Sequence, residues 1–167
     1  MERARQIFAK AHEETTNLRV LNLASEFYYR TGDLKAADDI LERWLAISGR
    51  EAETGDTAAA YSNLGAIYQT LGELDRAEEM HKKALAIHEK LGLQEGMARD
   101  YGNLGLIYRT RGELDRTGRC TRSRWRSRGS SATSGAWSAS TGNLGLIYRM
   151  RGELDRAEET HKKSLAI

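Results

Sequence analysis

Residues 61–87 read YSNLGAIYQTLGELDRAEEMHKKALAI, and close copies of this stretch follow twice more along the chain. The leucine of the shared Asn-Leu-Gly segment lies at Leu64, Leu104 and Leu144, so the period is 40 residues. A repeat of this size cannot bury its apolar face alone, and it does so by stacking on its neighbours. The sequence therefore predicts a stacked repeat array.

Each unit is predicted to form two antiparallel helices. The apolar and small residues of its first half have the spacing i, i+3, i+4 and i+7 of one helix face: Tyr61, Leu64, Gly65 and Tyr68. Gly72 follows where that helix is expected to end, because glycine adopts the left-handed conformation of a helix C-terminus without strain. A second helical stripe begins at Leu74 and is expected to reach Leu91. These features predict an all-α fold.

The unit resembles a tetratricopeptide repeat, and the resemblance rests on the spacing of Tyr61, Leu64, Gly65, Tyr68, Gly72, Ala77 and Ala84. The long period is similar to that of kinesin-light-chain-like arrays rather than to the commoner repeat of about 34 residues. His81 and His161 depart from the pattern, because the family usually has an aromatic residue there. The resemblance implies a right-handed α-solenoid that serves as a binding scaffold and not as an enzyme.

The period also predicts the domain organisation, with repeats at 18–57 (diverged), 58–97, 98–137 and 138–167. Residues 1–17 are interpreted either as part of an earlier repeat or as a capping helix. Residues 48–60 are expected to connect the first two repeats, because they contain glycine and polar turn residues. The last repeat stops before its second helix would be complete, which favours a fragment of a longer array that self-associates through uncapped ends.

The sequence predicts no membrane-spanning helix, no metal site and no catalytic site. No apolar run approaches the roughly 20 residues that span a bilayer. The single cysteine, Cys120, suits a reducing compartment, so a cytoplasmic location is expected. His81 and His88 share a helix face two turns apart, but a metal site needs more converging ligands. No serine or cysteine nucleophile has a base beside it, and we predict no catalytic residue, cofactor or metal.

The second half of the third repeat departs from the pattern. Residues 117–141 read TGRCTRSRWRSRGSSATSGAWSAST, with five arginines, no lysine and no acidic residue, yet the repeat resumes in register afterwards. Codons for Met-His that are read one base late give Cys-Thr, and residues 120–121 stand 40 positions after Met-His at 80–81. Gly-Met likewise becomes Ala-Trp at 136–137. We interpret 117–141 as a compensated frameshift, either a sequencing error or a genuine pair of indels.

The rival interpretation is a low-complexity arginine-serine segment that binds nucleic acid. The in-register codon matches favour the frameshift. The chain has 26 Lys and Arg against 24 Asp and Glu, and five of those cations lie in this stretch. The net charge is therefore no indication of a nucleic-acid partner, and none is predicted. Because serine, threonine and glycine are weak helix formers, residues 117–135 are expected to form a poor or frayed helix.

First helices line the concave surface in the family that the unit resembles, so their polar residues are the predicted partner site. The site residues are Asn63, Gln69, Arg99, Asn103, Arg109, Asn143 and Arg149, with Ser62 and Leu106 beside them. An amide both donates and accepts hydrogen bonds and can therefore hold a peptide backbone. The arginines add a preference for an acidic segment. The alternative is that these asparagines only bond neighbouring helices.

Two classes of function follow from this reading. The first is a protein-interaction scaffold that binds a peptide or helix of a partner in its groove. The second is a structural, oligomerisation or regulatory spacer array within a larger signalling protein. The partner class predicted in the first case is a protein or peptide with acidic character.

Overall fold

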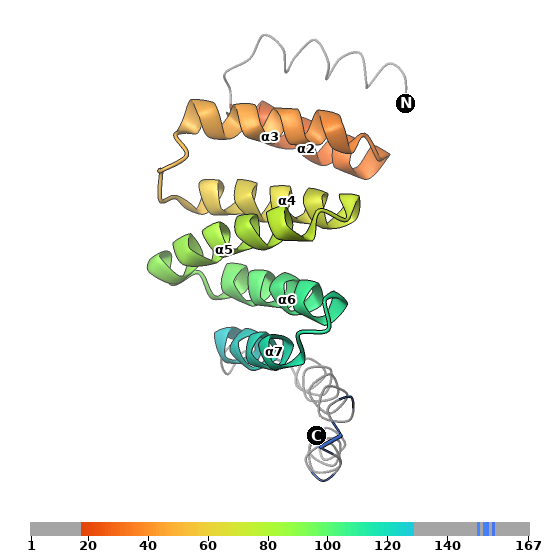
Figure 1. Cartoon of the computed structure of the whole chain (residues 1–167). Coiled ribbons are helices and arrows are strands. Elements are labelled where there is room, and N and C mark those ends of the chain that lie inside the picture. Colours follow the sequence, from red (N-terminus) through yellow and green to blue (C-terminus); the bar gives the residue numbers. More distant parts are fainter. Residues whose placement is uncertain (1–17, 129–149, 151, 154, 156–167) are drawn as a thin grey trace. The chain divides into compact units, whose positions relative to one another are not determined.

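A computed structural model describes residues 18–128 together with 150, 152, 153 and 155. Its helices are α2 (Leu18–Thr31), α3 (Leu34–Ser48), α4 (Gly55–Leu71), α5 (Leu74–Leu91), α6 (Gln94–Thr110) and α7 (Leu114–Arg128) (Figure 1). The described part of the chain contains no strand, and none of its helices is both long and apolar enough to cross a membrane. The predicted fold class, an all-α helical-repeat solenoid, is confirmed.

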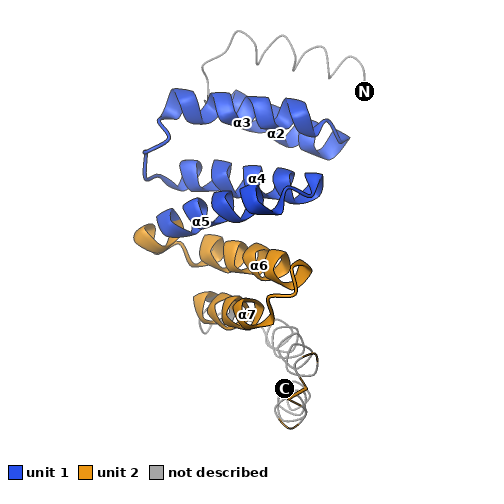
Figure 2. Ribbon diagram, viewed as in Figure 1, with its two compact units in different colours: residues 1–87 blue, residues 88–167 orange. Residues whose placement is uncertain are grey.

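The chain divides into two compact units, 1–87 and 88–167, and the boundary falls inside α5 (Figure 2). In the first unit α2 packs against α3, and α3 packs against α4. In the second unit α6 packs against α7. The last turn of α5, from His88 onward, belongs to the second unit. The domain boundaries predicted from the period stay predictions, as does the interpretation of residues 1–17, which lie outside the described part.

Glycines end the first helix of each pair, as the sequence predicts. Gly72 has φ +80° and follows α4, and Gly112 has φ +75° and follows α6. Beyond these glycines the chain turns back, and the Glu73 N–H donates to the Tyr68 carbonyl at 2.9 Å. The Glu113 N–H makes the same bond to the Tyr108 carbonyl at 2.8 Å. Only glycine adopts this left-handed conformation without a steric cost.

The connection predicted at 48–60 is wrong in its second half, because α4 already begins at Gly55. Thr54 is the N-cap, and its hydroxyl accepts a hydrogen bond from the Thr57 N–H at 3.1 Å. Asp56 lies in the first turn, where a carboxylate is favoured by the helix dipole. The polar residues that look like a loop therefore start a helix.

Helix α7 is the largest difference from expectation. The predicted frayed helix over 117–135 is wrong as far as Arg128, and residues 129–135 lie outside the described part. The hydroxyls in α7 bond carbonyls one turn back: Thr121 to Thr117 at 2.9 Å and Ser127 to Ser123 at 3.0 Å. Cys120 packs beside Gly105 of α6. Tertiary packing and good helix-forming arginines thus outweigh the weak residues.

Candidate protein-binding surface

A clamp around Tyr68 fixes how α4 is rotated about its axis. The Tyr68 ring is buried, and its hydroxyl donates to Asp38 Oδ1 on α3 at 2.8 Å. Arg76 Nη2 donates to the same hydroxyl at 2.7 Å, and Arg76 Cζ lies 3.9 Å from the ring centroid. Arg76 Nη1 also pairs with Glu73 Oε2 at 2.7 Å. Burial, followed by the bond to Asp38, raises the pKa of the Tyr68 phenol.

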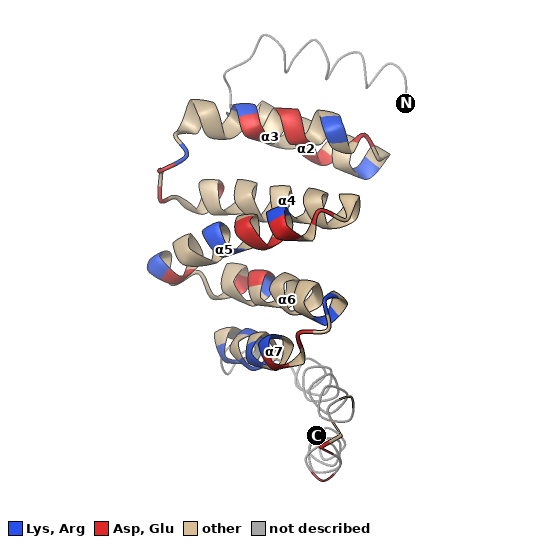
Figure 3. Ribbon diagram, viewed as in Figure 1, with Lys and Arg blue, Asp and Glu red and all other residues tan. Residues whose placement is uncertain are grey.

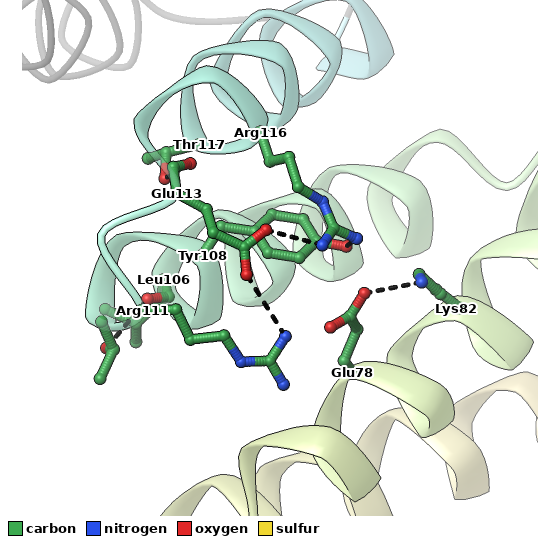
Figure 4. A network of polar contacts seen from close by, with 9 residues as sticks. Glu78, Lys82, Leu106, Tyr108, Arg111, Glu113, Arg116 and Thr117 are labelled. Atoms are coloured by element: carbon green, nitrogen blue, oxygen red, sulfur yellow. Dashed lines mark hydrogen bonds and ion pairs between the residues drawn. The ribbon is translucent and has the colours of Figure 1, made fainter.

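The second unit builds the same clamp on α6 and α7. Arg116 Nη2 donates to the Tyr108 hydroxyl at 2.8 Å, and Arg116 Cζ lies 3.8 Å from the ring centroid (Figure 4). Arg116 Nη1 pairs with Glu113 Oε2 at 2.7 Å. We call each set of three residues, Tyr68 with Glu73 and Arg76 or Tyr108 with Glu113 and Arg116, the Tyr-Glu-Arg clamp. Because the tyrosines face inward, the opposite faces of α4 and α6 are turned outward.

The outward faces carry the predicted site residues. The exposed ones are Asn63, Arg99 and Arg109. Those of intermediate exposure are Gln69 and Asn103. Asn143 and Arg149 lie outside the described residues. Thus α4 contributes two residues in the first unit and α6 contributes three in the second.

The two helices present these residues in the same register. At about 100° per residue, positions spaced i, i+4, i+7 and i+11 form one stripe along a helix. On α4 the stripe is Ala59, Asn63, Ala66 and Thr70, and on α6 it is Arg99, Asn103, Leu106 and Thr110. Gln69 and Arg109 lie about 60° from Ala66 and Leu106 of these stripes, and we call each stripe together with that residue a first-helix face. The face of α6 includes an apolar residue that is 42% exposed, Leu106.

Ser62 was expected on the outward side and that prediction is wrong, since its side chain is only 3% exposed. It lies three residues before Gly65 along α4. Gly65 lies directly against the His81 ring, and a Cβ added at Gly65 would stand 2.6 Å from His81 Nε2. The buried part of α4 therefore extends further around the helix than the apolar pattern indicates.

The structure also contains a buried polar pair that the sequence reasoning missed. His88 Nδ1, in the last turn of α5, lies 2.7 Å from Asp100 Oδ2 on α6, and both side chains are buried. Gly96 makes room for the imidazole, because a Cβ there would fall 2.5 Å from His88 Nε2. The available signal was Gly96, which lies eight residues after His88 and four residues before Asp100. No set of three potential metal ligands occurs within the described residues.

Comparisons with known proteins agree with this geometry. Sequence models of the tetratricopeptide repeat match residues 56–116 and 137–167. A comparison with curated proteins finds no match. BtubC (BKLC) from P. vanneervenii has a similar structure, with a TM-score of 0.82 at 22% identity over 99% of this chain and 72% of that chain.

Two further solved structures are similar. A kinesin-light-chain-like protein from Podosopora anserina with nearly identical TPR-like repeats gives a TM-score of 0.73 at 20% identity, over 89% of this chain and 74% of that chain. Aspartyl phosphate phosphatase F from Bacillus subtilis gives 0.80 at 18% identity, over 96% of this chain and 44% of that chain. At such identities the structural likeness shows the fold alone. The family is shown by the sequence models that match residues 56–116 and 137–167: the chain belongs to the tetratricopeptide repeat family.

Proposed function

We propose that this chain is a protein-interaction scaffold whose first-helix faces bind a peptide or helix segment of a partner protein. Tetratricopeptide repeats are typically non-enzymatic interaction domains, which supports the general role. The finer proposal concerns where the partner binds. It assigns the contacts to Asn63 and Gln69 on α4 and, on α6, to Arg99, Asn103 and Arg109.

The observation that carries this proposal is the first-helix face of α6. Leu106 is exposed although it is a large apolar residue, and Asn103 and Arg109 lie three residues before and after it. An apolar anchor beside an amide and a guanidinium supplies what a peptide needs: a hydrophobic contact, a backbone hydrogen bond and a charge partner. We therefore expect a partner segment that carries an apolar residue next to acidic ones.

The test is a screen of immobilised peptides that pair an apolar residue with acidic neighbours, followed by variants of α6. Asn103→Ala, Leu106→Ala and Arg109→Glu should each weaken a bound peptide by more than about 1 kcal/mol. Asp115→Ala, at an exposed position on α7, is the control and should change affinity little. If a partner is found and none of the three α6 variants weakens it, the site assignment is wrong. If no partner depends on either first-helix face, the spacer role is favoured instead.

A further inference from the structure

Helix α7 carries a line of exposed arginines. Arg119, Arg122 and Arg126 are all exposed and have the spacing i, i+3 and i+7, and Figure 3 shows the basic residues along this helix. At about 100° per residue the three lie within roughly 60° of one another, and at about 1.5 Å per residue they span about 10 Å. We call these three residues the arginine stripe. Thr117, Cys120 and Ser127 lie on the opposite side of the helix and are buried.

The stripe lacks the charge compensation found on the equivalent helix. On α5, Lys82 pairs with Glu78 at 2.6 Å and Lys83 pairs with Glu79 at 2.7 Å. Forty residues later, Gly118 and Arg119 replace the two glutamates. Among the described residues, no hydrogen bond or ion pair joins an arginine of the stripe to a carboxylate. Three like charges on one helix face repel one another, and a bound polyanion would relieve that repulsion.

The wider surroundings are also basic. Residues 94–128, which form the α6–α7 pair, contain nine arginines against four acidic residues. Residues 55–91, which form the α4–α5 pair, contain four Lys and Arg against six acidic residues. The positive potential is therefore confined to the second of these helix pairs and is strongest where the stripe has no partner.

The kind of polyanion follows from what the stripe lacks. Among the α7 side chains that the structure describes, which do not include Trp125, none is a large exposed apolar residue that could serve a protein partner as a hydrophobic anchor. A phosphate backbone needs none, because its binding free energy comes from releasing condensed counterions when guanidinium groups neutralise phosphates. Arginine also matches the geometry of a phosphate with two parallel N–H donors.

We propose that the arginine stripe of α7 binds the phosphate backbone of a nucleic acid without reading its base sequence. This reverses the expectation of no nucleic-acid partner. That expectation rested on the interpretation of 117–141 as a shifted reading frame, whereas the charge of a guanidinium is the same whatever the origin of its codon. The site is distinct from the first-helix faces assigned to protein partners.

The test is fluorescence anisotropy of a labelled DNA duplex of about 20 base pairs at salt concentrations between about 50 and 200 mM. Three phosphate contacts predict a slope of about −3 for log Kobs against log salt. The triple variant Arg119→Gln/Arg122→Gln/Arg126→Gln should bind at least about tenfold more weakly at the lowest salt, with a slope close to zero. An unchanged affinity and slope would overturn the proposal.

Three controls keep the result interpretable. The triple Arg→Lys variant at the same positions keeps the charges and should retain the slope. Lys82→Gln/Lys83→Gln/Lys90→Gln also removes three cations, but from α5, and should change the slope by less than about one; an equal loss would mean that net charge alone governs binding. A polyglutamate of equal charge should not displace the DNA, and displacement would assign the stripe to an acidic protein segment. Circular dichroism of each variant must match the parent.

Discussion

The helix pairs α4–α5 and α6–α7 stand 40 residues apart in sequence and are held by the same Tyr-Glu-Arg clamp, yet their second helices share few outward residues. In α5 two ion pairs join the charged side chains, the buried Glu78 with Lys82 and the exposed Glu79 with Lys83. In α7 the same positions hold Gly118, Arg119, Arg122 and Ser123, and the helix persists. The comparison shows that the clamp and the buried side of a second helix decide whether it forms, while its outward face is free to change. Four predictions test this comparison at the positions where the pairs differ.

The largest expected effect is at the buried pair of α5 and α6. His88 and Asp100 occupy positions that hold Ser48 and Ala60 in the preceding repeat. Asp100→Ala leaves the histidine buried without its carboxylate and should cost about 3 kcal/mol of unfolding free energy in urea. The double variant His88→Ser/Asp100→Ala copies the preceding repeat and should be less destabilised than Asp100→Ala alone. An equal loss of unfolding free energy in the two variants would show that His88 and Asp100 are not energetically coupled.

The next largest effect on stability is expected from alanine substitutions at two equivalent glycines, Gly65 of α4 and Gly105 of α6. A Cβ at Gly65 would stand 2.6 Å from the buried His81 ring, whereas a Cβ at Gly105 would meet only Cys120 Cβ at 3.4 Å. Gly65→Ala should therefore cost about 2 kcal/mol through overpacking. Gly105→Ala should be neutral or stabilise by up to about 1 kcal/mol, because alanine favours a helix. Thermal unfolding of both variants measures whether their stabilities change as expected. Adding His81→Thr, the residue at the equivalent position 121, should rescue Gly65→Ala.

Substitutions at the N-caps of α4 and α6 are expected to change stability by a smaller amount. Thr54 caps α4 through its side chain, whereas Leu93 at the N-cap of α6 makes no side-chain cap bond. Thr54→Ala should lower the unfolding free energy by about 1 kcal/mol, and Leu93→Asp should raise it by up to about 1 kcal/mol. Leu93 is already 41% exposed, so little apolar burial is lost. If the two substitutions shift the urea midpoint in the same direction, the proposed difference between the N-caps of α4 and α6 is wrong.

The smallest effect appears at high pH. Burial, followed by the hydrogen bond to Glu89, raises the pKa of Tyr101 to about 12. A raised pKa means that the neutral phenol is favoured in the folded state. Its contribution to stability is complete below the unfolded pKa of about 10 and is lost as pH rises through 12. Absorbance near 295 nm should show this tyrosine ionising late, and Glu89→Gln should move its midpoint downward. An unchanged midpoint would rule out Glu89 as a cause.

Most of the fold could be predicted because residues close together in the sequence define the repeat unit. The spacing of Tyr61, Leu64 and Tyr68 reports how one helix is rotated, and Gly72 reports where it ends. The exposure of Asn63 on α4 follows from the same rotation. Thr54 was misread because a threonine before a glycine is both a loop signal and an N-cap signal. The distinction depends on whether the residues that follow pack against a neighbour.

The sequence by itself therefore determined the period, the paired helices and which side of α4 and of α6 faces outward, since helix geometry converts spacing into direction. The tertiary structure alone decided the burial of Ser62, the pairing of His88 with Asp100 and the persistence of α7 to Arg128. Each of these depends on a side chain from another helix, and spacing along one helix carries no information about what that neighbour presents. Packing also decided where weak helix formers are tolerated, because the contacts of the buried side outweigh intrinsic propensity.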